Sequence, residues 1–277
     1  MASKHLSAPI GPKEIIISSR NFKRFLSPTV DGEVKGCGLR APMKAKYDLR
    51  EELGLGEFDL PLIPESEWED RLALQIKDKA QLSDIRNSGK FGGQIPATDQ
   101  GGQPYCWAHS STSAILMVRA LNNQPYIELS AYAVACIIKN YRSSGGWSEE
   151  SLKFIAERGI PDAAHWPIQS KQKSNDNPET WANAKRYRFS GEWMSLSSQL
   201  MKKQLVTCLL SNIPVCTDLN WWSHAICTID LVSLSPFRTR ILNSWGNGWS
   251  QEGTGILEGS KAIPDDALAP RVATGAG

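Results

Sequence analysis

The chain has 277 residues, of which 41% are hydrophobic and 22% charged, and its 31 basic and 29 acidic side chains give a net charge of +2. This composition excludes collagen-like and intrinsically disordered chains, and no apolar run approaches the roughly 18 residues of a membrane-spanning helix. The near-balanced charge also argues against a dedicated nucleic-acid binder, which would carry a basic excess. The length allows one large domain or two lobes that share a core.

Two segments of opposite charge open the chain. Residues 1–46 carry nine Lys or Arg against three Asp or Glu, whereas residues 47–83 carry four bases against ten acids. Solvated segments that attract each other would show this pattern, and so would a docking arm for a partner or an inhibitory pro-segment. We therefore treat residues 1–77 as a charged N-terminal extension, with these interpretations left open.

The middle of the chain is predicted to be helical. The segment from Cys106 to Leu121 contains no Gly or Pro and keeps apolar residues at helical spacing. Ser148 opens another helix, because the acids that follow it suit a first turn, and Gly159 ends it. The predicted helices cover residues 106–121, 130–139, 148–158 and about 196–210.

The pattern changes to strands after this helical half. Four apolar segments bounded by turn residues read as strands, and they cover residues 213–219, 224–232, 238–242 and 255–258. A helical half followed by a β half predicts a site in the cleft between the two.

Cys106 stands at the first turn of the predicted helix, after a turn-rich stretch. The thiolate is the nucleophilic form of cysteine, and at a pKa of about 8.5 only a small fraction is ionised at neutral pH. A helix N-terminus favours the anion by roughly 0.3–1 kcal/mol, so an imidazolium partner is also needed. Taken alone, a cysteine before Trp107 is more typical of an inert buried thiol.

Of the four histidines, His224 is the best candidate for that partner. It begins an apolar strand, and Asn243 follows the next predicted strand. A neutral amide can accept a hydrogen bond from the imidazole and fix its orientation, and Trp245 could shield that bond from water. His109 lies one turn after Cys106 and is predicted to pack in the interior. Taken singly, His224 also fits a core position and Asn243 a polar turn.

Together these segments resemble the motifs of papain-like cysteine proteases. Gln100-Gly-Gly-Gln-Pro-Tyr-Cys106-Trp-Ala resembles the active-site signature of that family. Gly145-Gly146, Ser223-His224-Ala225 and Asn243-Ser-Trp-Gly-Asn-Gly-Trp249 resemble the remaining motifs in the same order. The histidine follows the cysteine by 118 residues and the asparagine by 137, against about 130–150 for the family.

This resemblance implies a role for each matched residue. Cys106 would be the nucleophile, and His224 the base that later protonates the leaving amine. Asn243 would hold the imidazole, and the side chain of Gln100 would donate to the oxyanion together with the Cys106 backbone N–H. Peptide or isopeptide hydrolysis by this route needs no metal or organic cofactor.

The same matching implies a substrate-binding surface. Gly146 would pair with the backbone of an extended substrate. Further residues would line the binding site, with restricted space for the second side chain before the scissile bond: Gly145, Trp147, Ser148, Trp222 and Ala225. Trp107 and Trp245 would support the catalytic residues.

The chain also departs from the family pattern. Gln103 and Ser143 stand where the family has two half-cystines, and Cys136 matches a third without an evident partner. Loss of the disulfide positions suits a reducing compartment. Pro104 and Tyr105 replace small residues beside the nucleophile, so the adjoining subsite would have a different shape.

The sequence therefore predicts an α+β, papain-like, two-lobed fold. The catalytic domain would span residues 78–262, with a helical lobe over about 100–190 and an antiparallel β lobe over about 191–262. Residues 1–77 would precede it, and residues 263–277 would form an extended C-terminal tail.

Other functions fit the residues less well. A zinc site built from Cys208, Cys216, His224 and Cys227 lacks a metal-binding knuckle, and no G-x-S-x-G motif of a serine hydrolase occurs. The serious alternative is a papain-like structural component of a larger assembly, such as a virus or phage particle, with weak or no peptidase activity.

Expectations about the surroundings follow from the same features. Met1 leads into no apolar stretch of the kind found in secretory signals, so we expect a cytoplasmic or particle-associated protein. The expected partners are a polypeptide substrate and a protein or particle docked through residues 1–77. We expect no nucleic acid and no membrane.

Overall fold

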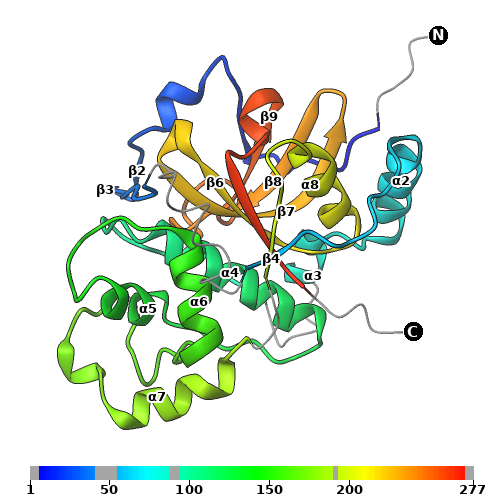
Figure 1. Cartoon of the computed structure of the whole chain (residues 1–277). Coiled ribbons are helices and arrows are strands. Elements are labelled where there is room, and N and C mark those ends of the chain that lie inside the picture. The colour runs from blue at the N-terminus through cyan, green and yellow to red at the C-terminus, as the bar shows by residue number, and fades with distance from the viewer. Residues whose placement is uncertain (1–5, 41–54, 88–93, 190–192, 272–277) are drawn as a thin grey trace.

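The computed structural model describes residues 6–40, 55–87, 94–189 and 193–271, and these form two lobes (Figure 1). One lobe is built on a twisted sheet, and the other contains helices α4 to α7. One large cluster of buried apolar side chains lies between helix α4 and one face of the sheet, and a second lies beneath α2 and α8. This is the α+β arrangement expected from the sequence.

The predicted helices are present within a few residues of their expected ends. The α-helices are α2 Trp68–Asp78, α3 Leu82–Asn87, α4 Cys106–Leu121, α5 Ala131–Ile138, α6 Ser148–Arg158, α7 Pro178–Ala184 and α8 Met201–Leu210. Short 3-10 helices cover Phe22–Phe25, Glu65–Glu67, Lys173–Asn175, Lys185–Tyr187, Asn220–Trp222 and Gly259–Ala262.

Within the described ranges, eight strands form one sheet in the order β1-β9-β8-β7-β6-β10-β5-β4. They are β1 Ile15–Ile17, β4 Leu55–Glu57, β5 Trp193–Ser195, β6 Val215–Leu219, β7 His224–Leu234, β8 Phe237–Leu242, β9 Thr254–Glu258 and β10 Asp266–Pro270. Strands β2 Thr29–Val30 and β3 Glu33–Val34 form a separate antiparallel pair. The four predicted strands are β6, β7, β8 and β9, which lie in the middle of the sheet and near one edge.

Helix α4 is the central element between the lobes. Every residue in it except Arg119 and Leu121 is buried, because α4 packs against β7 on one side and against α5 and α6 on the other. For this reason α4 is not divided into an apolar face and a polar face, as is expected of a helix surrounded by protein. Its first residue, Cys106, is thereby fixed at the boundary of the two lobes.

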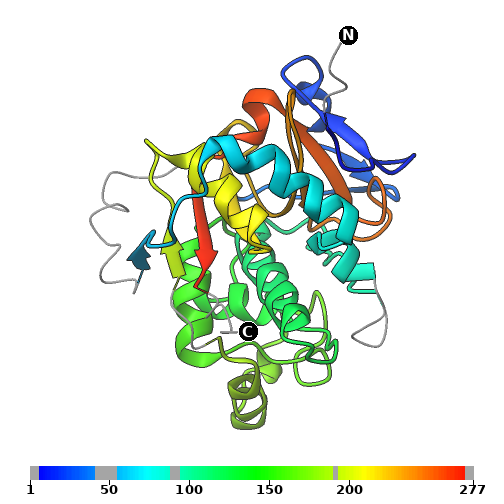
Figure 2. The same ribbon diagram turned by 90° about the vertical axis from the view of Figure 1, so that its right-hand side faces the viewer.

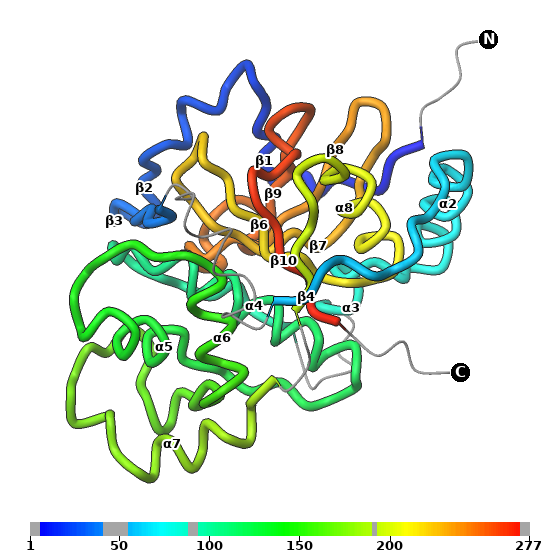
Figure 3. The backbone as a smooth tube through the Cα atoms, in the orientation of Figure 1, coloured from blue at the N-terminus to red at the C-terminus, as the bar shows by residue number. Residues whose placement is uncertain are grey.

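Both flanking regions contribute to the sheet, which differs from the expected separation of an extension, a catalytic domain and a tail. From the N-terminal region, β1 pairs in parallel with β9, and β4 pairs in parallel with β5. From the C-terminal region, β10 inserts between β6 and β5. Figure 3 shows how the N-terminal chain runs over the β lobe before it reaches the lobe boundary at β2 and β3. Figure 2 shows α2 lying across α8.

No helix in the part of the chain that the structure describes combines the length and apolar character needed to cross a membrane.

Candidate active site

Cys106 is the first residue of α4 and is fully buried. Burial raises the pKa of its thiol to about 11, although backbone N–H groups of Ala225 and Gly38 hydrogen-bond to the sulfur and oppose this rise. The thiol therefore lies beside Ala225 of β7, the residue that follows His224. The sulfur of the helical lobe and the start of a strand in the β lobe meet at one point.

His224 is held by Asn243. The Nε2 atom of the imidazole lies 2.8 Å from Oδ1 of the amide, and the backbone N–H of Ser244 donates to the same oxygen at 2.8 Å. An oxygen that accepts from Ser244 also accepts from the ring, so Nε2 carries the hydrogen in the neutral tautomer. The other ring nitrogen, Nδ1, is buried and has no hydrogen-bond partner in the described residues. It is the nitrogen left to act as a base.

Antiparallel pairing of neighbouring strands brings these two residues together. His224 is the first residue of β7, and Asn243 directly follows the last residue of β8, with which β7 pairs. Trp245 stacks on the imidazole, with ring centroids 4.7 Å apart and planes at 24°. Trp245 thus covers one face of the imidazole that Asn243 holds. Burial lowers the pKa of His224 to about 4, against a smaller opposing effect of the Asn243 bond.

Gln100 connects the loop before α4 to the β lobe. Its backbone N–H donates to the Ser244 carbonyl at 2.9 Å, and its side-chain oxygen accepts from the Ser244 hydroxyl. Its amide Nε2 donates to two carbonyls, those of Gln103 at 2.7 Å and Gly36 at 2.8 Å. The amide that the resemblance assigns to an oxyanion is thus engaged by a carbonyl of the N-terminal region.

The expected substrate-binding residues lie around this centre. Added to Gly146, a Cβ would be 2.7 Å from the ring of Trp107, so only glycine fits there. The Trp107 indole donates to the Pro104 carbonyl, and Lys139 lies over the rings of Trp107 and Trp147. Trp222 is buried and packs between Trp221, His224 and Trp245. Its indole is therefore part of the packing around the imidazole.

Residues 35–40, here called the crossing segment, pass directly over this centre. The backbone N–H of Leu39 donates to the Ser223 carbonyl at 3.0 Å, and Gly146 and the crossing segment exchange two further bonds, Gly146 N–H to Gly38 O at 3.0 Å and Arg40 N–H to Gly146 O at 3.1 Å. Only glycine fits at positions 36 and 38, because a Cβ at either Gly36 or Gly38 would come within 2.5 Å of backbone atoms of residues 103–104.

Sequence reasoning did not find the crossing segment or Asp218. For the crossing segment, the only local indication in the sequence is the pair of glycines on either side of Cys37. Asp218 is buried, pairs across the sheet with Ala225, and accepts a hydrogen bond from the Ser148 hydroxyl at 2.7 Å. Its charge adds to the rise in the pKa of Cys106, of which burial is the main cause.

The expected interior position of His109 is confirmed. His109 is buried, its ring packs edge-on against Tyr132, and burial lowers its pKa to about 3. All six cysteines of the chain are free. At the positions of the missing disulfide, the Ser143 hydroxyl donates to the Gln103 side chain, so a hydrogen bond joins the same two points.

Comparison with known proteins decides the family. The profile described as "Papain family cysteine protease" matches residues 81–228, more than half of the 277 residues. The chain belongs to the papain family. The matched range includes Gln100, Cys106 and His224 and ends before Asn243.

Curated members of the papain family are distant relatives. Ananain from Ananas comosus is 22% identical over 242 residues, which cover 78% of this chain and 61% of ananain. Chymopapain from Carica papaya is 24% identical over 182 residues, covering 58% of this chain and 51% of chymopapain. The chain thus spans between about half and three fifths of the length of these relatives.

Solved structures show the same fold. Xylellain, a cysteine protease from Xylella fastidiosa, superposes with a TM-score of 0.61 at 16% identity, over 85% of this chain and 96% of xylellain. Digestive procathepsin L 3 from the larval midgut of Tenebrio molitor gives 0.57 at 15% identity, over 85% and 83%. At such identities the likeness concerns the papain-like fold.

Proposed function

We propose that this protein is a cysteine peptidase that hydrolyses peptide or isopeptide bonds. Cys106 is the nucleophile, His224 the general base and acid, Asn243 the residue that orients the imidazole, and Gln100 the side-chain donor to the oxyanion. Gly145, Gly146, Trp147, Ser148 and Ala225 contact the substrate, and Trp222 supports the imidazole beside them.

The reaction is acyl transfer followed by hydrolysis. Nδ1 of His224 takes the thiol proton while the sulfur bonds to the carbonyl carbon of the substrate, and the same proton leaves with the amine as the C–N bond breaks. Water then attacks the thioester, with His224 taking its proton and returning it to the sulfur. The Gln100 amide and the Cys106 backbone N–H stabilise the oxyanion formed in each step.

The observation that carries this proposal is the state of the His224 ring. One nitrogen is fixed at 2.8 Å from the Asn243 oxygen, and the other is buried without a hydrogen-bond partner in the described residues, beside the strand residue whose N–H meets the Cys106 sulfur. An imidazole fixed through one nitrogen by an amide oxygen, with its second nitrogen unpaired in the described residues and a thiol nearby, has the arrangement that an activated cysteine nucleophile requires.

The crossing segment supports a latent form of this peptidase. Burial holds the pKa of Cys106 at about 11 and that of His224 at about 4, so both groups are neutral at pH 7. The thiolate and imidazolium expected from the sequence would have to be stabilised by water or by the substrate. In the proposed latent form, residues 35–40 occupy the place of both. We propose that the N-terminal extension is inhibitory, which is one of the two specific roles left open by its charge pattern.

Labelling and cleavage together test the peptidase proposal. Once the crossing segment is displaced, an epoxide-type thiol inhibitor is expected to label one cysteine per chain at neutral pH, mapped to Cys106 by mass spectrometry. A fluorogenic peptide library is expected to be cleaved only under reducing conditions. Cys106→Ala should abolish both signals, whereas Cys208→Ala, at another buried cysteine, should leave them intact.

A different outcome would favour the non-catalytic alternative. Labelling of other cysteines, or an absence of cleavage despite a displaced segment, would make this chain a papain-like structural component rather than a peptidase.

A further inference from the structure

The crossing segment lies between two stretches of chain that are built into the sheet. Upstream, β1 pairs with β9 through Ile15, Ile16 and Ile17, and the backbone N–H of Ala8 donates to the Val232 carbonyl at 2.7 Å. The side chains of Ala8 and Ile17 are buried. This stretch therefore contributes a strand and core side chains to the β lobe, rather than lying on its surface.

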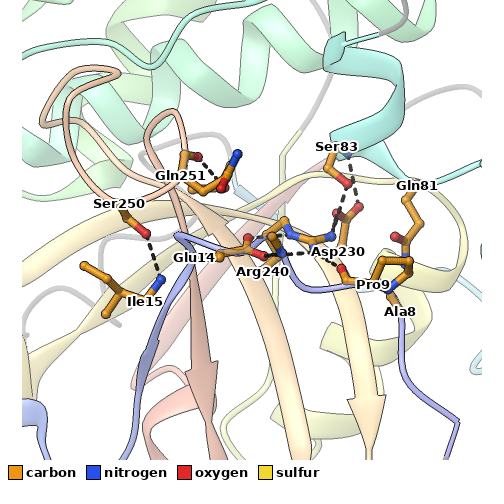
Figure 4. A network of polar contacts seen from close by, with 12 residues as sticks. Ala8, Pro9, Glu14, Ile15, Gln81, Ser83, Asp230, Arg240, Ser250 and Gln251 are labelled. Atoms are coloured by element: carbon orange, nitrogen blue, oxygen red, sulfur yellow. Dashed lines mark hydrogen bonds and ion pairs between the residues drawn. The ribbon is translucent and has the colours of Figure 1, made fainter.

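A buried ionic network fixes the same upstream stretch (Figure 4). The guanidinium of Arg240 on β8 bonds to Glu14 at 2.7 Å and to Asp230 on β7 at 2.9 Å. It also donates to the Pro9 carbonyl. Although burial opposes its charge, these partners hold the pKa of Arg240 above its ordinary value. Removing Glu14 would leave a buried cation with one carboxylate partner fewer, which is costly.

The downstream stretch is fixed independently. Strand β4 pairs with β5, and Ile63 donates its N–H to the Thr207 hydroxyl at 3.1 Å. Helix α2 buries Trp68 and Leu72 against α8, and its Gln75 amide donates to the Leu209 carbonyl at 3.0 Å. The chain is thus held at both ends of the part that covers Cys106.

The crossing segment itself has a different kind of attachment. Backbone bonds attach it once each to Gly101 and Ser223 and twice to Gly146. Side-chain bonds add the Gln100 amide on the Gly36 carbonyl and the Arg40 guanidinium on the Ser144 hydroxyl. The Lys35 ammonium lies 2.7 Å from Glu33 and 3.0 Å from Asp99. Beyond Lys35, its apolar side chains in the core are two, Leu39, which is buried, and Cys37, which is partly buried. A short stretch with few buried apolar contacts opens at a lower free energy than the strands on either side of it.

We propose that displacement of the crossing segment alone exposes Cys106, while the N-terminal stretch on β9 stays bound as a permanent part of the sheet, even after a cut in front of the crossing segment. The inference rests on the proposed function for its regulatory meaning. The cut is a hydrolysis in which water adds across one peptide bond, leaving a new carboxylate and a new amine. The active form is then two chains held by β1, by Ala8 and by the Arg240 network.

An engineered cut tests retention of the N-terminal stretch. The turn between β2 and β3 at Asp31 and Gly32 is exposed, and nothing lies within 4 Å of a Cβ at Gly32, so it can accept the recognition sequence of a site-specific protease in the full chain. After digestion, both fragments are expected to co-elute in gel filtration and to appear as one complex in native mass spectrometry. Elution of the N-terminal fragment on its own would overturn the proposal.

Variants of the network sharpen this test. In the cut protein, Glu14→Gln should weaken retention of the fragment at least tenfold in a dilution series, because it removes one partner of Arg240. Glu128→Gln, at an exposed glutamate outside the network, should leave retention unchanged. Equal retention in both variants would contradict the role of Arg240.

Uncut variants test the displacement. Gly38→Ala would place a Cβ 2.2 Å from the Pro104 carbonyl oxygen, whereas the Cβ of Gly102→Ala meets only a contact at 3.5 Å. The first variant should raise the iodoacetamide labelling rate of Cys106 at least tenfold over wild type, and the second should not. Lys35→Met, which removes the ion pairs with Glu33 and Asp99, should act in the same direction as Gly38→Ala.

The amides of β1 should keep their protection from hydrogen exchange in all these uncut variants. Unchanged Cys106 labelling in both Gly38→Ala and Lys35→Met, or loss of β1 protection together with the gain in labelling, would overturn the proposal. Neither measurement depends on peptide hydrolysis. A retained fragment and an exposed Cys106 without peptidase activity would therefore contradict the proposed function and leave this inference standing.

Discussion

At the scale of a single residue, the two proposed roles of Gln100 oppose each other. In the covered site its amide donates to the Gly36 carbonyl at 2.8 Å, which holds the crossing segment in place. In the proposed reaction the same amide donates to an oxyanion. Under this proposal, a carbonyl oxygen of the chain occupies the donor that the substrate would need, and one residue serves both the reaction and the latent form.

Gln100→Ala should separate these two effects. Because one oxyanion donor is typically worth about 100- to 1000-fold in kcat, we expect kcat for peptide cleavage to fall by about that factor with little change in KM. Labelling of Cys106 by iodoacetamide in the uncut chain should become faster, since the bond to Gly36 is lost.

The neighbouring Gln103 provides the control for this prediction. Its side chain accepts from Ser143, away from the thiol, so Gln103→Ala should change neither quantity. A fall in kcat without faster labelling would show that Gln100 does not hold the crossing segment.

At the scale of elements, helix α4 could be predicted from the sequence because its signals are local. It has no Gly or Pro between Cys106 and Leu121, and the structure gives it the same ends. Strands β6 to β9 were predicted for a similar reason, since each is an apolar run between turns. The pairing of His224 with Asn243 followed from the resemblance and agrees with the β7–β8 register.

The strands β1, β4 and β10 could not be predicted in this way. β1 and β4 have three residues each, too few for a periodicity of two to be visible, and their parallel partners lie far away in the sequence. Ile15 pairs with Gly255, for example. Their stability comes from the sheet edge that receives them, and the sequence of a short segment does not show which edge is available.

The two faces of β1 give a direct test of its place in the sheet. Ile17 is fully buried in the core beneath the sheet, whereas Ile16 is only partly buried. Ile17→Ala should lower the free energy of unfolding by about 2–5 kcal/mol, and Ile16→Ala should cost clearly less. Urea denaturation followed by tryptophan fluorescence measures both. Equally small effects would mean that the N-terminal stretch is a detachable arm.

At the scale of the whole molecule, the chain holds Cys106 and two histidines in its interior. His109 and His224 are both buried, on α4 and β7 respectively, and burial lowers the pKa of the first to about 3 and of the second to about 4. The sequence indicated an interior position for His109 and a partner role for His224. It did not indicate that the N-terminal region would bond to Ser223 and Trp222, the two residues before the second.

Stability in acid should reflect these two histidines. In the unfolded chain each has an ordinary pKa of about 6.5, so between pH 6.5 and about 4 the unfolded state binds more protons than the folded state. The stability that each contributes is therefore complete above pH 6.5 and is lost as the pH falls, by roughly 1.4 kcal/mol per pH unit and per histidine.

His109→Phe, which keeps a ring against Tyr132, should remove one of these contributions. The loss of stability between pH 6.5 and 4 should then be less steep, as measured by urea denaturation at a series of pH values. An equal slope in wild type and His109→Phe would show that His109 is already protonated, or exposed to solvent, in the folded protein.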